Sequence, residues 1–275
     1  MGAWTLDDIP WHRFDPSRLD PDIVRLVKAA SLVEFNGGAY ARHLCRVFAD
    51  DPEFCASAER WGAEEVQHGA TLARWAQMAD PAFDFTKAFA RLQAGYQVDF
   101  DIDSSRRGSR AGELIARCIV ETGTSSYYTV LRDAAAEPVL QEICRHIAAD
   151  ELRHYRLFYK NLSAYLARER LGRWARLRIA LGRIAESEDD ELAHAYYAAN
   201  EAVGESGLPY DRRRYSRAYA RRALALYRTH HVERMVAMVL KAVGLTPNGR
   251  LSRVIGILAW QAMRYRVGRL AKAAA

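Results

Sequence analysis

The sequence repeats one helical pattern of glutamates and histidines, and this repeat limits the folds that the chain can adopt. A Glu-x-x-His segment occurs at Glu65–His68 and again at Glu151–His154. A lone glutamate precedes each segment, Glu34 by 31 residues and Glu121 by 30. Because residues three apart share one face of a helix, each segment presents a carboxylate and an imidazole on the same side. The two halves are offset by 87 and 86 residues, which predicts two similar helical hairpins.

The turn positions place each lone glutamate opposite its own Glu-x-x-His segment. The midpoint of the first pair falls near Asp50 and that of the second falls beside Pro138, in segments typical of helix ends. Residues equidistant from the turn of an antiparallel hairpin lie at the same height. Two packed hairpins would therefore bring four carboxylates and two imidazoles to one interior point, the di-iron or di-manganese arrangement of ferritin-like bundles. The predicted metal ligands are Glu34, Glu65, His68, Glu121, Glu151 and His154.

The flanking residues favour an interior metal site over a solvated acidic face. Glu34 follows Ala-Ala-Ser-Leu-Val and Glu121 follows Ala-Arg-Cys-Ile-Val. Carboxylates on such apolar segments are costly to bury without cations. Carboxylate-rich ligation with two imidazoles and no thiolate suits iron, with manganese as the second choice. A third Glu-x-x-His segment, Glu191–His194, has no partner glutamate and follows an acidic run, so it is predicted to lie on the surface.

Two further features surround the predicted ligands. Glu64 precedes Glu65 and Asp150 precedes Glu151, so each acid is placed to accept the free ring N–H of the opposite histidine and to fix its tautomer. Gly37–Gly38, one turn beyond the first lone glutamate, is unfavourable in a helix interior. This glycine pair either opens space for O2 or an acyl chain, or lets two helices pack closely.

The period of apolar residues is helical along the whole chain, and no run alternates as a strand would. We therefore expect an all-α protein: a ferritin-like four-helix bundle over 1–168 with a crossover segment, and a basic helical extension over 169–275 packed on the bundle. The predicted helices cover about 21–49, 52–78, 108–135, 138–168, 171–186, 189–204, 211–243 and 249–272, with one more inside the crossover at 82–106.

Composition excludes several classes of protein. Half of the residues are hydrophobic and 27% are charged, which excludes a disordered or low-complexity chain. The four cysteines show no C-x-x-C spacing, which argues against zinc ribbons, rubredoxin-type iron sites and disulfide scaffolds. The N-terminus lacks a signal-peptide pattern, and the longest apolar run, about Val254–Met263, is roughly half of a spanning helix. We expect a cytoplasmic protein, with peripheral contact to a membrane left open.

Two segments match beyond the ligands themselves and resemble the soluble acyl-acyl-carrier-protein desaturases. Residues 61–69, Trp-Gly-Ala-Glu-Glu-Val-Gln-His-Gly, are similar to the family's Trp-x-Ala-Glu-Glu-x-x-His-Gly segment. Residues 143–154, Ile-Cys-Arg-His-Ile-Ala-Ala-Asp-Glu-Leu-Arg-His, are similar to its Ile-Cys-x-x-Ile-Ala-Ala-Asp-Glu-x-Arg-His segment. The segment Glu121-Thr-Gly-Thr124 also resembles the family, with a threonine one turn after the ligand. The resemblance covers roughly residues 30–165 and is lost in the C-terminal third.

The resemblance implies an O2-dependent di-iron oxidoreductase that acts on C–H bonds of a fatty acyl chain, as a desaturase or hydroxylase. The substrate would be bound to a carrier protein or associated with a membrane, and a ferredoxin-like protein would supply electrons. In that family, the hydroxyl at the position of Thr124 lies beside the oxygen-binding face of the cluster. The positions of Asp150 and Trp61 lie on an electron route to the iron.

Two other functions stay open. Quinone hydroxylases, aldehyde-deformylating oxygenases and other ferritin-like enzymes share the six-ligand set, so the substrate can also be a quinone, an amine or an aldehyde. A third function, from another class, is a metal-binding protein that detoxifies peroxide or holds iron without an organic substrate.

Charge is distributed unevenly along the chain. Residues 1–159 carry 18 Lys/Arg against 24 Asp/Glu, whereas residues 160–275 carry 22 against 10. The basic C-terminal third suits an acidic carrier protein or an anionic membrane, unless it is a solvated face without a partner. No RNA-binding motif accompanies the arginines, which argues against nucleic acid; a homodimer stays open. The candidate partner-binding residues are Arg212, Arg213, Arg214, Arg217, Arg221 and Arg222, and Arg250, Arg253, Arg264, Arg266, Arg269 and Lys272 flank the apolar stretch around Trp260.

Overall fold

Helices dominate the computed structural model, which describes residues 4–96, 104–186, 190–201 and 209–272. Within these ranges there is no strand, so the all-α prediction is confirmed there. The α-helices are α1 (Pro21–Phe35), α2 (Gly37–Val47), α3 (Pro52–Ala79), α4 (Phe85–Gly95), α5 (Arg110–Ala134), α6 (Pro138–Glu169), α7 (Arg173–Glu186), α8 (Asp190–Asn200), α9 (Arg212–Ala225), α10 (Thr229–Ala242) and α11 (Arg250–Lys272). Three 3₁₀ turns precede them: η1 (Leu6–Asp8), η2 (Trp11–Arg13) and η3 (Pro16–Arg18).

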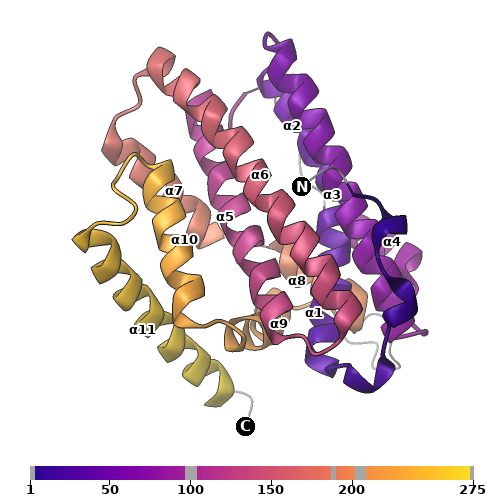
Figure 1. Cartoon of the computed structure of the whole chain (residues 1–275). Helices are drawn as coiled ribbons and strands as arrows, with labels where there is room; N and C mark the ends of the chain where they lie inside the picture. The colour runs from indigo at the N-terminus through magenta and orange to yellow at the C-terminus, as the bar shows by residue number, and fades with distance from the viewer. Residues whose placement is uncertain (1–3, 97–103, 187–189, 202–208, 273–275) are drawn as a thin grey trace.

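The long helices pack as two hairpins, as the repeat predicts. Helix α5 packs along α6, while α3 packs along α1 and α2 and also contacts α6 (Figure 1). Helix α4, inside the predicted crossover at 82–106, contacts α8 and α1. Residues 97–103 of that crossover and 202–204 of the predicted helix 189–204 lie outside the described part of the chain. The apolar faces of the hairpins form the interior in which the predicted ligands lie.

Side-chain caps explain where the long helices begin. Asp51 precedes Pro52 and accepts a hydrogen bond from the backbone N–H of Phe54 at the start of α3. Glu137 precedes Pro138 and accepts hydrogen bonds from two backbone N–H groups at the start of α6. Both starts combine a capping acceptor with proline at the first helical position, where its missing N–H costs no hydrogen bond. The helix starts predicted at residues 52 and 138 are therefore confirmed.

The predicted helix over 21–49 is wrong in one respect, because it is broken at Asn36. The backbone N–H of Asn36 bonds to Val33 rather than one residue further back, and α2 begins immediately afterwards. A Cβ atom at Gly37 would lie 2.3 Å from Cβ of Glu65 in α3. The break and the missing side chain thus let α2 approach α3 directly beside a predicted ligand. Of the two explanations for this glycine pair, close helix packing fits the structure.

The predicted helix over 211–243 is also divided, into α9 and α10. Arg228 is extended, with φ −126° and ψ 165°, and its backbone N–H donates a hydrogen bond of 3.1 Å to Nδ1 of His231. The imidazole therefore caps the new helix from its third position. No glycine or proline marks this break, so the periodic pattern alone does not predict it.

The C-terminal helices cover the hairpins along several sides. Helix α8 packs against α1, α4 and α9, while α10 packs between α5 and α11 (Figure 1). Helix α7 packs against α5. Among the residues described, no helix combines the length and apolarity needed to cross a bilayer.

Candidate metal centre

Four helices bring the six predicted ligands together inside the hairpins. The ligand atoms form two groups, and within each group all of them lie within 4.8 Å of one another. Glu65 and Glu151 belong to both groups. One group consists of Glu34, Glu65, His68 and Glu151, and the other of Glu65, Glu121, Glu151 and His154. Every member of both groups is buried. These groups can each hold a metal ion, with two carboxylates common to both.

Atoms without hydrogen-bond partners mark the centre of this cluster. They are Oε1 of Glu65, Nδ1 of His68, Oε2 of Glu121, Oε1 of Glu151 and Nδ1 of His154. Nδ1 of His154 lies 3.0 Å from Oε1 of Glu65, and Nδ1 of His68 lies 3.2 Å from Oε1 of Glu151. Buried polar atoms are normally hydrogen-bonded, so several unpaired ones facing one another call for a ligand. Oxygen and imidazole atoms in this arrangement fit metal cations.

The outer nitrogen of each histidine contacts an acid from the opposite hairpin. Nε2 of His68 lies 3.1 Å from Oδ2 of Asp150, and Nε2 of His154 lies 2.6 Å from Oε2 of Glu64. With Nε2–H donating to the acid, each Nδ1 carries the lone pair that faces the cluster. This is the contact predicted from the two acid–Glu pairs.

Arg153 joins these two acids, and the sequence analysis did not identify it. One guanidinium nitrogen donates to Oδ1 of Asp150 at 2.6 Å, and another donates to Oε2 of Glu64 at 3.1 Å. The same cation therefore balances both carboxylates and fixes their positions relative to each other. Its position two residues after Glu151, within the Asp-Glu-x-Arg-His segment, was the available signal.

Without a bound metal, burial and the repulsion between neighbouring carboxylates determine which ligands are protonated. Burial, reinforced by the neighbouring carboxylates, raises the pKa of Glu34 well above its usual range. Burial likewise raises the pKa of Glu121. Although burial opposes the charged imidazole, the hydrogen bond to Asp150 and the nearby carboxylates of Glu151 and Glu65 raise the pKa of His68 to about 9. The protein alone thus offsets its carboxylates with protons, a role that metal cations can take over.

The tryptophan that contacts Asp150 is Trp4, which the sequence analysis did not single out. Its Nε1–H donates a hydrogen bond of 2.7 Å to Oδ2 of Asp150, and its ring lies parallel to that of His68 with centroids 6.0 Å apart. Trp61 instead meets the ring of His154 edge to face, with centroids 6.5 Å apart. The two tryptophans therefore flank different histidines.

Two hydroxyl groups on α5 contact the predicted ligands. Thr124 donates a hydrogen bond of 2.5 Å to Oε2 of Glu151. Tyr128, which the sequence analysis missed, donates one of 2.6 Å to Oε1 of Glu34. Because these residues follow Glu121 by three and seven positions, the helical period places all three on one face. That spacing could have identified Tyr128 from the sequence.

The prediction that Glu191–His194 lies on the surface is wrong. Both side chains are buried, at 7% and 9% exposure. Glu191 accepts a hydrogen bond of 2.6 Å from the Tyr40 hydroxyl and one of 3.1 Å from the Asn36 side chain. The acidic run before it suggested solvent exposure, but α8 packs against α1 and α4 and covers this turn. Glu191 thereby holds Asn36, at the break between α1 and α2, and Tyr40 of α2 against α8.

The candidate partner-binding arginines on α9 do not share one environment. Arg212, Arg213, Arg214 and Arg217 are exposed, whereas Arg221 is half-buried. Arg222 forms an ion pair of 2.6 Å with Asp22, and only 12% of its side chain is exposed. Its charge is therefore engaged within the fold.

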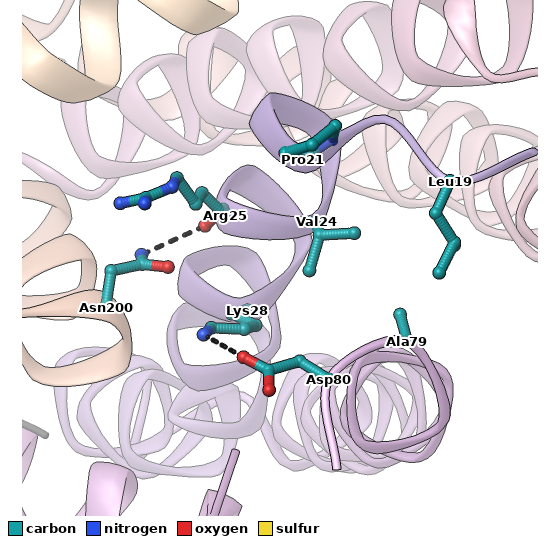
Figure 2. Close-up of a pocket in the computed structure, with 8 residues that line it drawn as sticks. All are labelled: Leu19, Pro21, Val24, Arg25, Lys28, Ala79, Asp80 and Asn200. Carbon is teal, nitrogen blue, oxygen red and sulfur yellow. Dashed lines mark hydrogen bonds and ion pairs between the residues drawn. The ribbon is translucent and has the colours of Figure 1, made fainter. Parts of the chain in front are cut away.

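Other features that could hold a ligand lie away from the cluster. Asp133, His230 and His231 form another group near α10, but Nδ1 of His231 accepts the Arg228 N–H, so its Nε2 carries a proton. A pocket of about 440 Å³ lies between α1 and the end of α3 (Figure 2). It contains the ion pair between Lys28 and Asp80, at 2.8 Å, and no ligand of the cluster lines it.

Sequence comparisons add no family to these observations. No protein-family model matches the chain, and no curated protein sequence matches it significantly.

Proposed function

We propose that the protein is an O2-dependent di-iron oxidoreductase with a ferritin-like bundle, and that it removes hydrogen from C–H bonds of a fatty acyl chain. The observation that carries this proposal is the pair of buried groups that share Glu65 and Glu151. Two shared carboxylates hold two cations close together, and carboxylates with only two imidazoles favour iron over softer metals. The desaturase-like segments around Trp61 and Ile143 supply the expected substrate class.

The residues of the chain would divide the work as follows. Glu65 and Glu151 would bridge two metal ions, with Glu34 and His68 on one and Glu121 and His154 on the other. When bound, the iron ions would supply O2 reduction and hydrogen removal, with two electrons per turnover from a ferredoxin-like donor.

The surrounding residues would hold these ligands in place. Asp150 and Glu64 orient the histidines through their Nε2–H groups, and Arg153 fixes both acids. The Thr124 hydroxyl holds Glu151 and the Tyr128 hydroxyl holds Glu34. These hydrogen bonds limit the motion of each carboxylate, which keeps the ligand geometry fixed.

Metal content tests the centre itself. We expect about two ferrous ions per chain after anaerobic loading, since the two groups share their bridging ligands. Glu65→Ala should lose most of this iron, whereas Glu59→Ala, an exposed glutamate on the same helix, should keep it. Fewer than about one ion per chain in the unmodified protein, with no change in Glu65→Ala, would contradict a dimetal site.

Lipid profiling tests the substrate. Aerobic expression with a ferredoxin and its reductase should give new unsaturated or hydroxylated acyl chains, and Glu151→Ala should abolish them. Unchanged fatty acids in a strain whose protein carries full iron would reject the acyl substrate. Electron-dependent O2 consumption with an added quinone, amine or aldehyde would then favour the second function.

A further inference from the structure

Helix α11 packs through small residues and exposes its large apolar side chains. Ser252 and Gly256 are buried on the face toward α10, where α11 makes its main contacts. Leu251, Val254 and Leu258 are 56%, 54% and 58% exposed. Surface helices normally present polar residues to solvent, so a helix that exposes large apolar side chains calls for a further contact. In Figure 1 this helix forms the outer edge of the molecule beside α10.

Four of the five exposed large apolar residues of α11 lie in a stripe along one side of the helix. Leu251, Val254, Leu258 and Tyr265 follow one another at intervals of three, four and seven residues, so they share one side of the helix. The stripe is about 21 Å long at 1.5 Å per residue. Tyr265 is 70% exposed near its C-terminal end, and its ring can lie at a boundary between apolar and polar media. We call these four residues the α11 stripe.

The charge of the helix limits what can cover the stripe. The sequence of α11 contains no Asp or Glu, and its exposed basic residues include Arg250, Arg253, Arg264, Arg269 and Lys272. Helix α9, which packs beside α11, adds the exposed Arg213 and Arg217. A second copy docking through the same stripe would bring these cations together, and like charges across an interface are unfavourable. The charge of α11 therefore favours an anionic partner over a second copy.

The shape of the stripe favours a lipid surface among anionic partners. The exposed apolar residues of the stripe all lie on one helix, which forms an edge of the fold in Figure 1, and α11 does not line the pocket between α1 and α3. A helix with an apolar face and basic residues beside it lies in the interface of an anionic bilayer, with the apolar side chains inserted among the acyl chains. Nearby arginines then contact the phosphate groups.

The neighbouring helix α7 has the same character. Trp174 is 84% exposed and Leu181 is 56% exposed, and four arginines lie on the same short helix. A Cβ atom at Gly244, in the turn between α10 and α11, would lie 2.9 Å from the guanidinium of Arg176, which places α7 next to this turn. A second helix with exposed apolar and basic residues therefore lies next to the turn that leads into α11.

We propose that the α11 stripe attaches the protein peripherally to an anionic membrane. The proposal does not depend on the metal centre, because no ligand of the cluster lies on α11. It explains why the basic charge and the exposed apolar residues occur on the same helix. The stripe would insert, and the arginines beside it would select anionic over zwitterionic lipid.

Vesicle co-sedimentation of the full chain tests this attachment. We expect binding to phosphatidylcholine vesicles that contain about 30% phosphatidylglycerol, and at least tenfold weaker binding to pure phosphatidylcholine. The double variant Leu251→Gln/Leu258→Gln should weaken binding about tenfold or more while the melting temperature stays unchanged, since both side chains are exposed. Arg264→Gln/Arg269→Gln should weaken it to a similar extent, whereas Arg18→Gln/Arg60→Gln, which removes the same charge from exposed sites elsewhere, should have little effect.

Four outcomes would overturn the proposal. They are an absence of sedimentation with anionic vesicles, equal binding to the two kinds of vesicle, unchanged binding in Leu251→Gln/Leu258→Gln, and binding to polyglutamate without binding to vesicles. A dimer in size-exclusion chromatography that Leu251→Gln/Leu258→Gln converts to a monomer, without vesicle binding, would instead assign the stripe to a second copy.

Discussion

Trp4 donates a hydrogen bond of 2.7 Å to Asp150, a residue 146 positions away in the sequence. Asp150 in turn contacts Nε2 of His68, so the N-terminal segment closes one side of the cluster. The backbone carbonyl of Trp4 also accepts a hydrogen bond from Gln67. The segment before α1 is therefore part of the structure that positions a predicted ligand.

Replacing Trp4 tests this relationship. We expect Trp4→Phe to lower the free energy of unfolding by about 1–3 kcal/mol, because it removes a hydrogen bond to a charged and buried acceptor. Trp174→Phe, at a side chain that is 84% exposed, should change it by less than about 0.5 kcal/mol. Chemical denaturation of both variants provides the measurement, and equal effects would show that the Trp4 contact is unimportant.

Adjacent glycines provide a test of the close packing between α2 and α3. Gly37→Ala should destabilise the protein by about 1–3 kcal/mol, because its Cβ would meet that of Glu65 at 2.3 Å. Gly38→Ala should be neutral or stabilise by up to about 1 kcal/mol, because its nearest neighbour would be Val66 at 3.6 Å and alanine favours the helix. Thermal unfolding compares the two, and effects of the same sign and size would contradict the packing.

Iron binding by these two variants extends the comparison. Displacement of Glu65 in Gly37→Ala should reduce the iron content, while Gly38→Ala should keep it. Full iron content in a folded Gly37→Ala protein would show that the ligand can shift without loss.

The partly buried ion pair between Lys28 and Asp80 predicts a specific dependence of stability on pH. Although partial burial opposes its ionisation, the hydrogen bond from Lys28 lowers the pKa of Asp80 below its usual value. A lowered folded-state pKa stabilises the protein above the unfolded pKa of about 3.9, and this contribution is lost as the pH falls through the folded value. Asp80→Asn should therefore cost roughly 1 kcal/mol at pH 7, after allowance for screening at a side chain that is 34% exposed.

Urea unfolding between pH 7 and pH 3 measures this contribution. The difference in stability between the unmodified protein and Asp80→Asn should shrink as the pH is lowered. Asp7→Asn, at an exposed carboxylate in the 3₁₀ turn η1, serves as the control. A difference that is constant over this range would show that Asp80 does not contribute through its charge.

Because the carboxylate of Glu191 is buried, replacing it should destabilise the protein more than replacing a surface acid. Glu191→Gln should destabilise the protein by about 1–3 kcal/mol, because the amide can accept at only one of the two positions now bonded to Tyr40 and Asn36. Glu186→Gln, in a partly exposed pair with Arg107, should cost less than about 1 kcal/mol. Denaturation midpoints of the two variants compare these losses of stability. A larger loss in Glu186→Gln than in Glu191→Gln would show that the Glu191 hydrogen bonds contribute no more than a surface ion pair.

The helical period and the repeated ligand spacing could be obtained from the sequence because both are local properties of a helix. Residues three positions apart share one face of any helix, so Glu65 and His68 are paired as soon as their helix forms. The distance to the turn then places Glu34 level with them, and the structure brings these side chains together. The capping residues Asp51 and Glu137 are likewise local signals.

Only the tertiary structure decided which distant residues surround the cluster. Trp4, Tyr128 and Arg153 contact acids on other helices or segments, and the local signals near Tyr128 and Arg153 do not specify which distant acid each one meets. The burial of Glu191 likewise depends on how α8 packs across α1, and the break at Asn36 depends on how closely α2 approaches α3. Helical periodicity specifies which face a residue occupies, whereas the neighbour that meets that face is fixed by the packing of helices far apart in the chain.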